Sequence, residues 1–180
     1  SRRASAPGLI WGIGIRQVRI TCGLILFSYL LSHFANHALG NVSLAVMSDW
    51  LDLHMAFWRH PVVATVFYTA GITHWSLGLW ALYQRRHFRF KTSEAIQLVF
   101  GLSIPLLLAQ HVVAERLGLA IYGIERGYAQ ALYAFWVAAP ERGVVQTIAL
   151  LVAWTHACIG IFFWLRLKRW FPRAAPALLA

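Results

Sequence analysis

Five histidines lie inside the long apolar stretches of this sequence, where an ionisable side chain is costly and usually functional. His33 and His37 stand one helical turn apart in the stretch LLSHFANHALGN. His74, His111 and His156 each lie in a later apolar stretch. Neutral imidazole is the commonest metal ligand among the side chains and also relays protons. The residue types therefore indicate metal or proton chemistry inside the apolar part of the molecule.

Depth along each stretch sorts these histidines into two layers. At 1.5 Å per residue, His74 and His156 lie about 16 Å from the end of the stretch that adjoins the basic loops, while His37 and His111 lie about 26 Å from it. His33 falls between the layers, nearer to the outer one. Each layer joins two stretches, the second with the fourth and the first with the third. These are the diagonal pairs of an up-down bundle of four helices.

Two imidazoles that face each other across a bundle are the ligands of a six-coordinate haem, which favours electron transfer because no axial position stays open. We therefore predict two b haems, the inner one held by His74 and His156 and the outer one by His37 and His111. His33 is the alternative outer ligand; otherwise it hydrogen-bonds a propionate or a quinone. Small residues near the ligands would give a porphyrin clearance: Ala70, Gly71, Gly78, Ala109, Ala114, Ala157 and Gly160.

The histidines have alternative interpretations. A histidine in a membrane helix often forms an interhelical hydrogen bond or relays protons, and small residues also serve ordinary helix packing. His33 and His37 at a spacing of four could begin a zinc site, but no carboxylate or thiol accompanies them. Four histidines, one on each stretch and matched at two depths, favour haem over these alternatives.

The composition is that of an integral membrane protein. Hydrophobic residues make up 59% of the 180 residues and charged residues 12%, which is about half the charged share of a soluble domain. The net charge of +10 is gathered in clusters between the apolar stretches, as in anchors for anionic lipid, and does not indicate a nucleic-acid-binding face. Cys22 and Cys158 both lie in apolar stretches, where small-residue packing is the expected role.

The sequence predicts an all-α fold, an up-down bundle of four transmembrane helices in one domain over residues 1–180. Leu44 to Trp58 has helical spacing of apolar residues and forms an amphipathic interfacial helix, with His54 and His60 solvated beside it. No internal repeat is evident. The predicted spans are about 19–40, 61–84, 94–116 and 144–166, with an interfacial lead at 1–15, an interfacial or partly re-entrant segment at 117–140, and the start of a further span at 172–180.

The placement of Lys and Arg predicts the orientation. Basic residues concentrate in the N-terminal lead, in the loop between the second and third spans, and after the fourth span. Because basic residues favour the cytoplasmic side, both termini of the chain are expected in the cytoplasm.

Four segments resemble one known family: SHFANHALGN at 32–41, THWSLGLWALYQRR at 73–86, AQHVVAER at 109–116 and WTHACIGIFFWLRL at 154–167. With them the sequence resembles the dihaem cytochrome b membrane anchor of some bacterial class III adenylate cyclases. That anchor is similar to the cytochrome b subunits of succinate dehydrogenase and fumarate reductase. The ordered set of four is specific, although each segment alone is weak.

The resemblance implies a multi-pass protein of the bacterial inner membrane that exchanges electrons with the quinone pool. It also implies a homodimer whose redox state regulates a C-terminal cyclase, which converts ATP to cyclic AMP. The sequence departs from the family in one respect. Family anchors have six spans, whereas this sequence predicts four spans and the start of a fifth. No cyclase residues are present, so this chain has no catalytic site of its own. The rival function is an electron-transfer subunit between quinone and a soluble dehydrogenase.

Overall fold

The computed structural model describes residues 14–123 and 127–172, and these residues form helices without a strand. Four helical stretches are long and apolar enough to cross a membrane, and they suggest a multi-pass membrane protein. They span Ile15–Asn41, Pro61–Tyr83, Thr92–Tyr122 and Pro140–Leu165. The all-helical prediction with four candidate spans is confirmed. The predicted interfacial lead up to residue 13 and the predicted further span from residue 173 lie outside the described residues.

The first two long helices have clear local boundaries. Helix α1 (Ile15–Ala38) ends in a 3₁₀ turn over Leu39–Asn41. Helix α3 (Pro61–Tyr83) begins at Pro61, where the missing N–H of proline costs nothing because the first turn has no intrahelical acceptor.

The third and fourth long helices extend beyond the predicted spans. Helix α4 (Thr92–Val112) continues through a π-helical turn at Val113–Leu117 into α5 (Gly118–Tyr122). Gly123 ends this helix with φ +64, a left-handed conformation that glycine adopts without strain. Helix α7 (Pro140–Leu165) begins four residues before the predicted span. Backbone hydrogen bonding continues past the apolar residues, so hydropathy places the ends of these helices too far inward.

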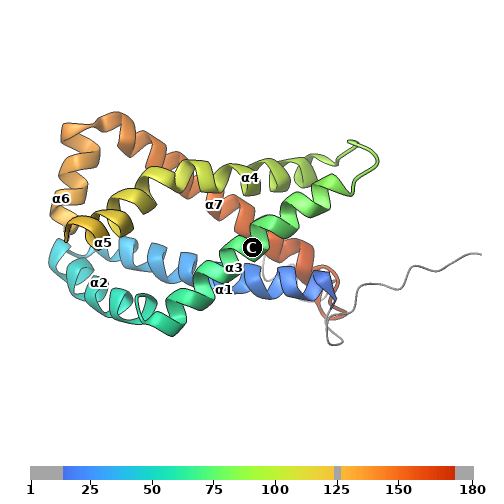
Figure 1. Cartoon of the computed structure of the whole chain (residues 1–180), viewed down its shortest axis with the longest axis horizontal. Coiled ribbons are helices and arrows are strands. Elements are labelled where there is room, and N and C mark those ends of the chain that lie inside the picture. Colours follow the sequence, from blue (N-terminus) through green and yellow to red (C-terminus); the bar gives the residue numbers. More distant parts are fainter. Residues whose placement is uncertain (1–13, 124–126, 173–180) are drawn as a thin grey trace, which may run out of the picture.

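The four long helices form two closely packed pairs (Figure 1). Helix α1 lies against α3, and α4 lies against α7, whereas α3 meets α4 and α1 meets α7 more loosely. Helix α1 is therefore diagonal to α4, and α3 is diagonal to α7. These are the two diagonal pairs on which the predicted histidine layers depend.

Two shorter helices lie together at one end of the bundle (Figure 1). Helix α2 (Leu44–Trp58) packs on α1, α3 and α6 (Tyr128–Tyr133), and α6 continues into a π-helical turn at Ala134–Ala138. The Ser43 side chain caps α2 by accepting a hydrogen bond of 3.1 Å from the backbone N–H of Val46. Met47 is buried, while Asp49 and Asp52 are exposed, which confirms that α2 is amphipathic.

Candidate functional site: two histidine pairs

The inner pair consists of His74 on α3 and His156 on α7. Their ring centres lie 6.2 Å apart and the ring planes are 88° to each other. The Nδ1 atom of His74 lies 3.0 Å from the carbonyl oxygen of Arg19, and that of His156 lies 2.9 Å from the carbonyl oxygen of Gln97. A carbonyl can only accept, so each Nδ1 carries the proton and donates it. Each Nε2 is then left with a free lone pair, as in a metal-binding histidine whose other nitrogen is fixed by a backbone group.

Two glycines give the inner histidines their positions. A Cβ atom added at Gly23 of α1 would lie 3.0 Å from Cε1 of His74, and one at Gly101 of α4 would lie 2.5 Å from Cε1 of His156. Each imidazole ring therefore lies directly against the helix backbone, and a side chain larger than that of glycine would displace the ring. Both glycines stand four residues after the residue whose carbonyl accepts the hydrogen bond. Sequence reasoning missed Gly23 and Gly101, because neither is near a histidine in the chain.

The inner contacts reveal a repeat that the sequence analysis did not expect. Helices α1 and α4 share the spacing glycine, nine residues, histidine, which places His33 ten residues after Gly23 and His111 ten residues after Gly101. Helices α3 and α7 share the pattern Thr-His-x-x-x-Gly, around His74 and His156. The prediction of no internal repeat is therefore wrong for these positions. The pattern relates α1 to α4 and α3 to α7.

The outer pair brings together His33 of α1 and His111 of α4. Their ring centres lie 6.1 Å apart with the planes at 61°, close to the separation of the inner pair. His37 stands beside His33, with the two Nε2 atoms 3.2 Å apart, and its ring lies 5.3 Å from that of Tyr128. His33, the alternative ligand of the sequence analysis, is thus the one whose distance from His111 matches the inner pair.

Depth counted from Arg19 and Glu94 favours His37 only if these two residues are equivalent edges of their helices. The inner contacts show that Arg19 corresponds to Gln97, since each supplies the carbonyl for an inner histidine. This shifts the reference on α4 by three residues, or about 4.5 Å. With that correction, His33 and His111 lie at the same depth.

A third helix adds His54 to the outer cluster. His54 is only 8% exposed, and its ring lies 5.7 Å from His33 and 5.5 Å from Tyr29. The prediction that His54 is solvated is wrong, whereas His60 is exposed as expected. His54 stands seven residues after the buried Met47, two helical turns along the same face, and this spacing could have identified it. Burial lowers the pKa of the His54 imidazole.

Asn36 ties three helices together at the same end. It is 5% exposed, and its side-chain amide donates a 3.1 Å hydrogen bond to the carbonyl oxygen of Met47 on α2. Its side-chain oxygen accepts from the hydroxyl of Tyr128 on α6. Burial, with a smaller effect from Tyr29, raises the pKa of Tyr128 to about 12, so the hydroxyl remains a donor. These two contacts fix α2 and α6 against α1 beside the outer pair.

The ring separations of both pairs are compatible with two imidazoles that would hold one haem iron between them. An imidazole nitrogen binds a metal at about 2 Å and the ring centre lies about 1 Å behind it, so two axial imidazoles have centres about 6 Å apart. The separations of 6.2 and 6.1 Å agree with this value. In the described part of the chain, no group of three or more His, Cys, Asp and Glu side chains could hold a metal ion. A haem iron needs only two protein ligands.

The two pairs differ in their polar partners. The Nδ1 atom of His111 is buried and has no hydrogen-bond partner among the described residues, unlike that of His74 or His156. An unpaired buried nitrogen costs free energy and is commonly explained by a ligand, an ion or a water. The inner pair is fully oriented by backbone, and the outer pair is not.

Comparison of the chain with protein-family models, with curated proteins and with solved structures finds no match. The histidine geometry and the four sequence segments are therefore the basis for a function of this chain.

Proposed function

We propose that this chain is a dihaem cytochrome b membrane anchor that senses the redox state of quinone and regulates an adenylate cyclase C-terminal to it. His74 and His156 would hold the inner haem, and His111 with a histidine of α1 the outer one. The observation that supports this most strongly is the matched geometry of the two diagonal histidine pairs. The ring centres are 6.2 and 6.1 Å apart, and both pairs follow one repeat in the sequence.

The protein's part in this chemistry is to hold and orient. A haem held by two histidines would supply single-electron exchange and would not favour oxygen binding. The carbonyl groups of Arg19 and Gln97 keep the inner imidazoles in the tautomer that presents Nε2. Gly23 and Gly101 let these rings lie directly on α1 and α4. Ligands held this way need little reorganisation when the iron changes its charge.

For the outer haem we propose His33 as the ligand from α1. The corrected register and the 6.1 Å separation from His111 favour His33, while the original depth count favours His37. The Nε2 of His37 lies 3.2 Å from the Nε2 of His33, so that contact would have to open if His33 bound iron through this nitrogen, and His37 would then stand beside the site. Replacing each histidine separately distinguishes the two assignments.

The regulatory role rests on the resemblance alone. The proposed location is the bacterial inner membrane, with the N-terminus in the cytoplasm, in a homodimer that exchanges electrons with the quinone pool. An electron-transfer subunit of the succinate dehydrogenase or fumarate reductase type would use the same histidine geometry. The coding sequence after Ala180 separates these two functions, because only the first requires a linker and a cyclase domain.

The haem assignment can be tested with the purified protein from haem-replete cells. We expect two haems per chain and, on reduction, the alpha band of a b-type cytochrome. A colourless preparation would contradict the proposal. For the regulatory role, cyclic AMP formation by the full-length protein should differ between membranes with oxidised and reduced quinone. Equal rates in the two, with both haems present, would favour the electron-transfer function.

A further inference from the structure

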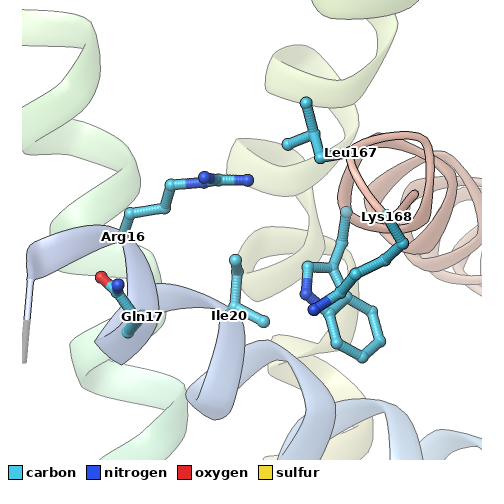
Figure 2. Close-up of a pocket in the computed structure, with 6 residues that line it drawn as sticks. Arg16, Gln17, Ile20, Leu167 and Lys168 are labelled. Atoms are coloured by element: carbon cyan, nitrogen blue, oxygen red, sulfur yellow. The ribbon is translucent and has the colours of Figure 1, made fainter.

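A pocket of about 220 Å³ lies between the beginning of α1 and the end of α7 (Figure 2). Arg16 and Lys168 extend toward the same space from the two helices. The lining is completed by the Gln17 amide and by three apolar side chains, Ile20, Trp164 and Leu167. This combination of two cations, a hydrogen-bonding amide and an apolar wall is chemically suited to an amphiphilic anion.

No described residue compensates the positive charge in this pocket. No acidic residue lines it, and within the described residues no carboxylate lies at ion-pair distance from Arg16 or Lys168. The ammonium group of Lys168 lies 5.1 Å from the ring centre of Trp164, a cation–π contact that holds it beside the pocket wall. Two neighbouring cations repel each other, so a bound anion would relieve a cost that no described carboxylate offsets.

The position of the pocket indicates a membrane ligand. It adjoins the first turn of one candidate span and the last turn of another, Ile15 and Leu165 being their ends. Tryptophan is characteristic of the headgroup level, where one edge of its ring is wet. The first turn of α1 has no side-chain cap, so its N–H groups add positive potential on the same side. Basic pockets between membrane helices on the cytoplasmic side bind the headgroups of acidic lipids.

We propose that this pocket binds the phosphate headgroup of an acidic phospholipid, with Arg16 and Lys168 pairing with the phosphate and Trp164 contacting the glycerol and upper acyl region. The ligand would join α1 to α7, which touch each other only loosely along the bundle. The site would thus link the two halves of the repeat at the cytoplasmic edge. It is independent of the histidines, so haem content should not depend on it.

The test compares the parent chain with its variants. Each is placed in nanodiscs of phosphatidylcholine that contain a small fraction of phosphatidylglycerol. We expect the double variant Arg16→Gln/Lys168→Gln to retain the acidic lipid about thirtyfold more weakly by native mass spectrometry, because each basic residue at the surface contributes about 1 kcal/mol. Arg86→Gln/Arg89→Gln is the matched control, with the same change of charge in the loop between α3 and α4. This control variant should retain the lipid as the parent does. The single variant Arg16→Lys, which keeps the positive charge, should bind the lipid nearly as well as the parent.

Three results would overturn the proposal. Equal retention by the pocket variant and the parent would show that the pocket is not the site. Equal loss in the Arg86/Arg89 control would show general attraction to a basic surface. Displacement of the lipid by excess inorganic phosphate would assign the pocket to a free anion. Haem count is measured on every sample, so a loss of lipid with two haems retained separates this proposal from the haem proposal.

Discussion

The inner and outer histidine pairs have nearly the same separation but very different surroundings. At the inner pair both Nδ1 atoms donate to backbone carbonyls, and both rings lie on glycines. At the outer pair His33 contacts His37, the Nδ1 of His111 has no partner among the described residues, and His54 and Tyr128 stand nearby. Backbone groups cannot titrate, whereas imidazoles can. The inner pair is therefore held by groups that cannot titrate, whereas the outer pair is surrounded by groups that can.

The largest effect should come from removing an inner ligand. His74→Ala or His156→Ala should lower the haem count from two to one per chain, because no other side chain in the described residues replaces either ligand. Quantitative pyridine haemochrome analysis of the purified variants measures this. His60→Ala, at an exposed position, is the control that should keep both haems. Added imidazole should restore part of the missing haem if the variant is folded. Simultaneous loss of both haems would argue against two separate sites.

The next effect tests the outer pair. His33→Ala should remove the outer haem, while His37→Ala should keep it and shift its midpoint potential. The physical reason is the equal register of His33 and His111 along their helices. Redox titration monitored at the alpha band resolves the two haems. The reverse order, with His37→Ala losing the haem, would restore the assignment made from depth alone.

A graded series of glycine substitutions tests the fixed character of the inner pair. Gly101→Ala should weaken the inner haem most, since the new Cβ would lie 2.5 Å from His156, and Gly23→Ala less, at 3.0 Å from His74. Overpacking of this kind costs about 1–3 kcal/mol, or up to roughly a hundredfold in haem affinity. Gly118→Ala is the control, because a Cβ there would lie no closer than 4.0 Å to its nearest neighbour, the carbonyl oxygen of Val113. Haem transfer to apomyoglobin gives the relative affinities. Equal effects at all three glycines would contradict the backbone cradle.

The smallest effect should be a pH dependence of the outer end. Burial lowers the pKa of His54 below its ordinary 6.5, so the folded protein binds this proton less readily than the unfolded chain. Stability from the docked α2 is then fully present above pH 6.5 and is lost as the pH falls through that value toward the folded pKa. Thermal unfolding between about pH 7.5 and about pH 5 should show this decline, and His54→Gln should flatten it. An unchanged profile in His54→Gln would place the titrating group elsewhere.

The sequence by itself determined the helices and the identity of the histidines. Apolar length is a local property, because each span must satisfy its backbone hydrogen bonds within itself, so four candidate spans could be found without knowing their neighbours. The diagonal pairing of His74 with His156 also followed, since both lie near the middle of their helices. The amphipathic pattern of Leu44 to Trp58 was sufficient to predict α2.

Only the tertiary structure decided the register between helices. Which histidine of α1 faces His111 depends on how far α1 slides relative to α4, and no residue within one helix encodes that. Contacts between residues distant in the sequence set the relative height of α1 and α4. In these contacts the rings of His74 and His156 lie against the carbonyl groups and glycines of α1 and α4. The burial of His54 has the same origin, because solvation depends on what packs over a helix face. Long-range packing thus placed the site whose chemistry the residue types had already suggested.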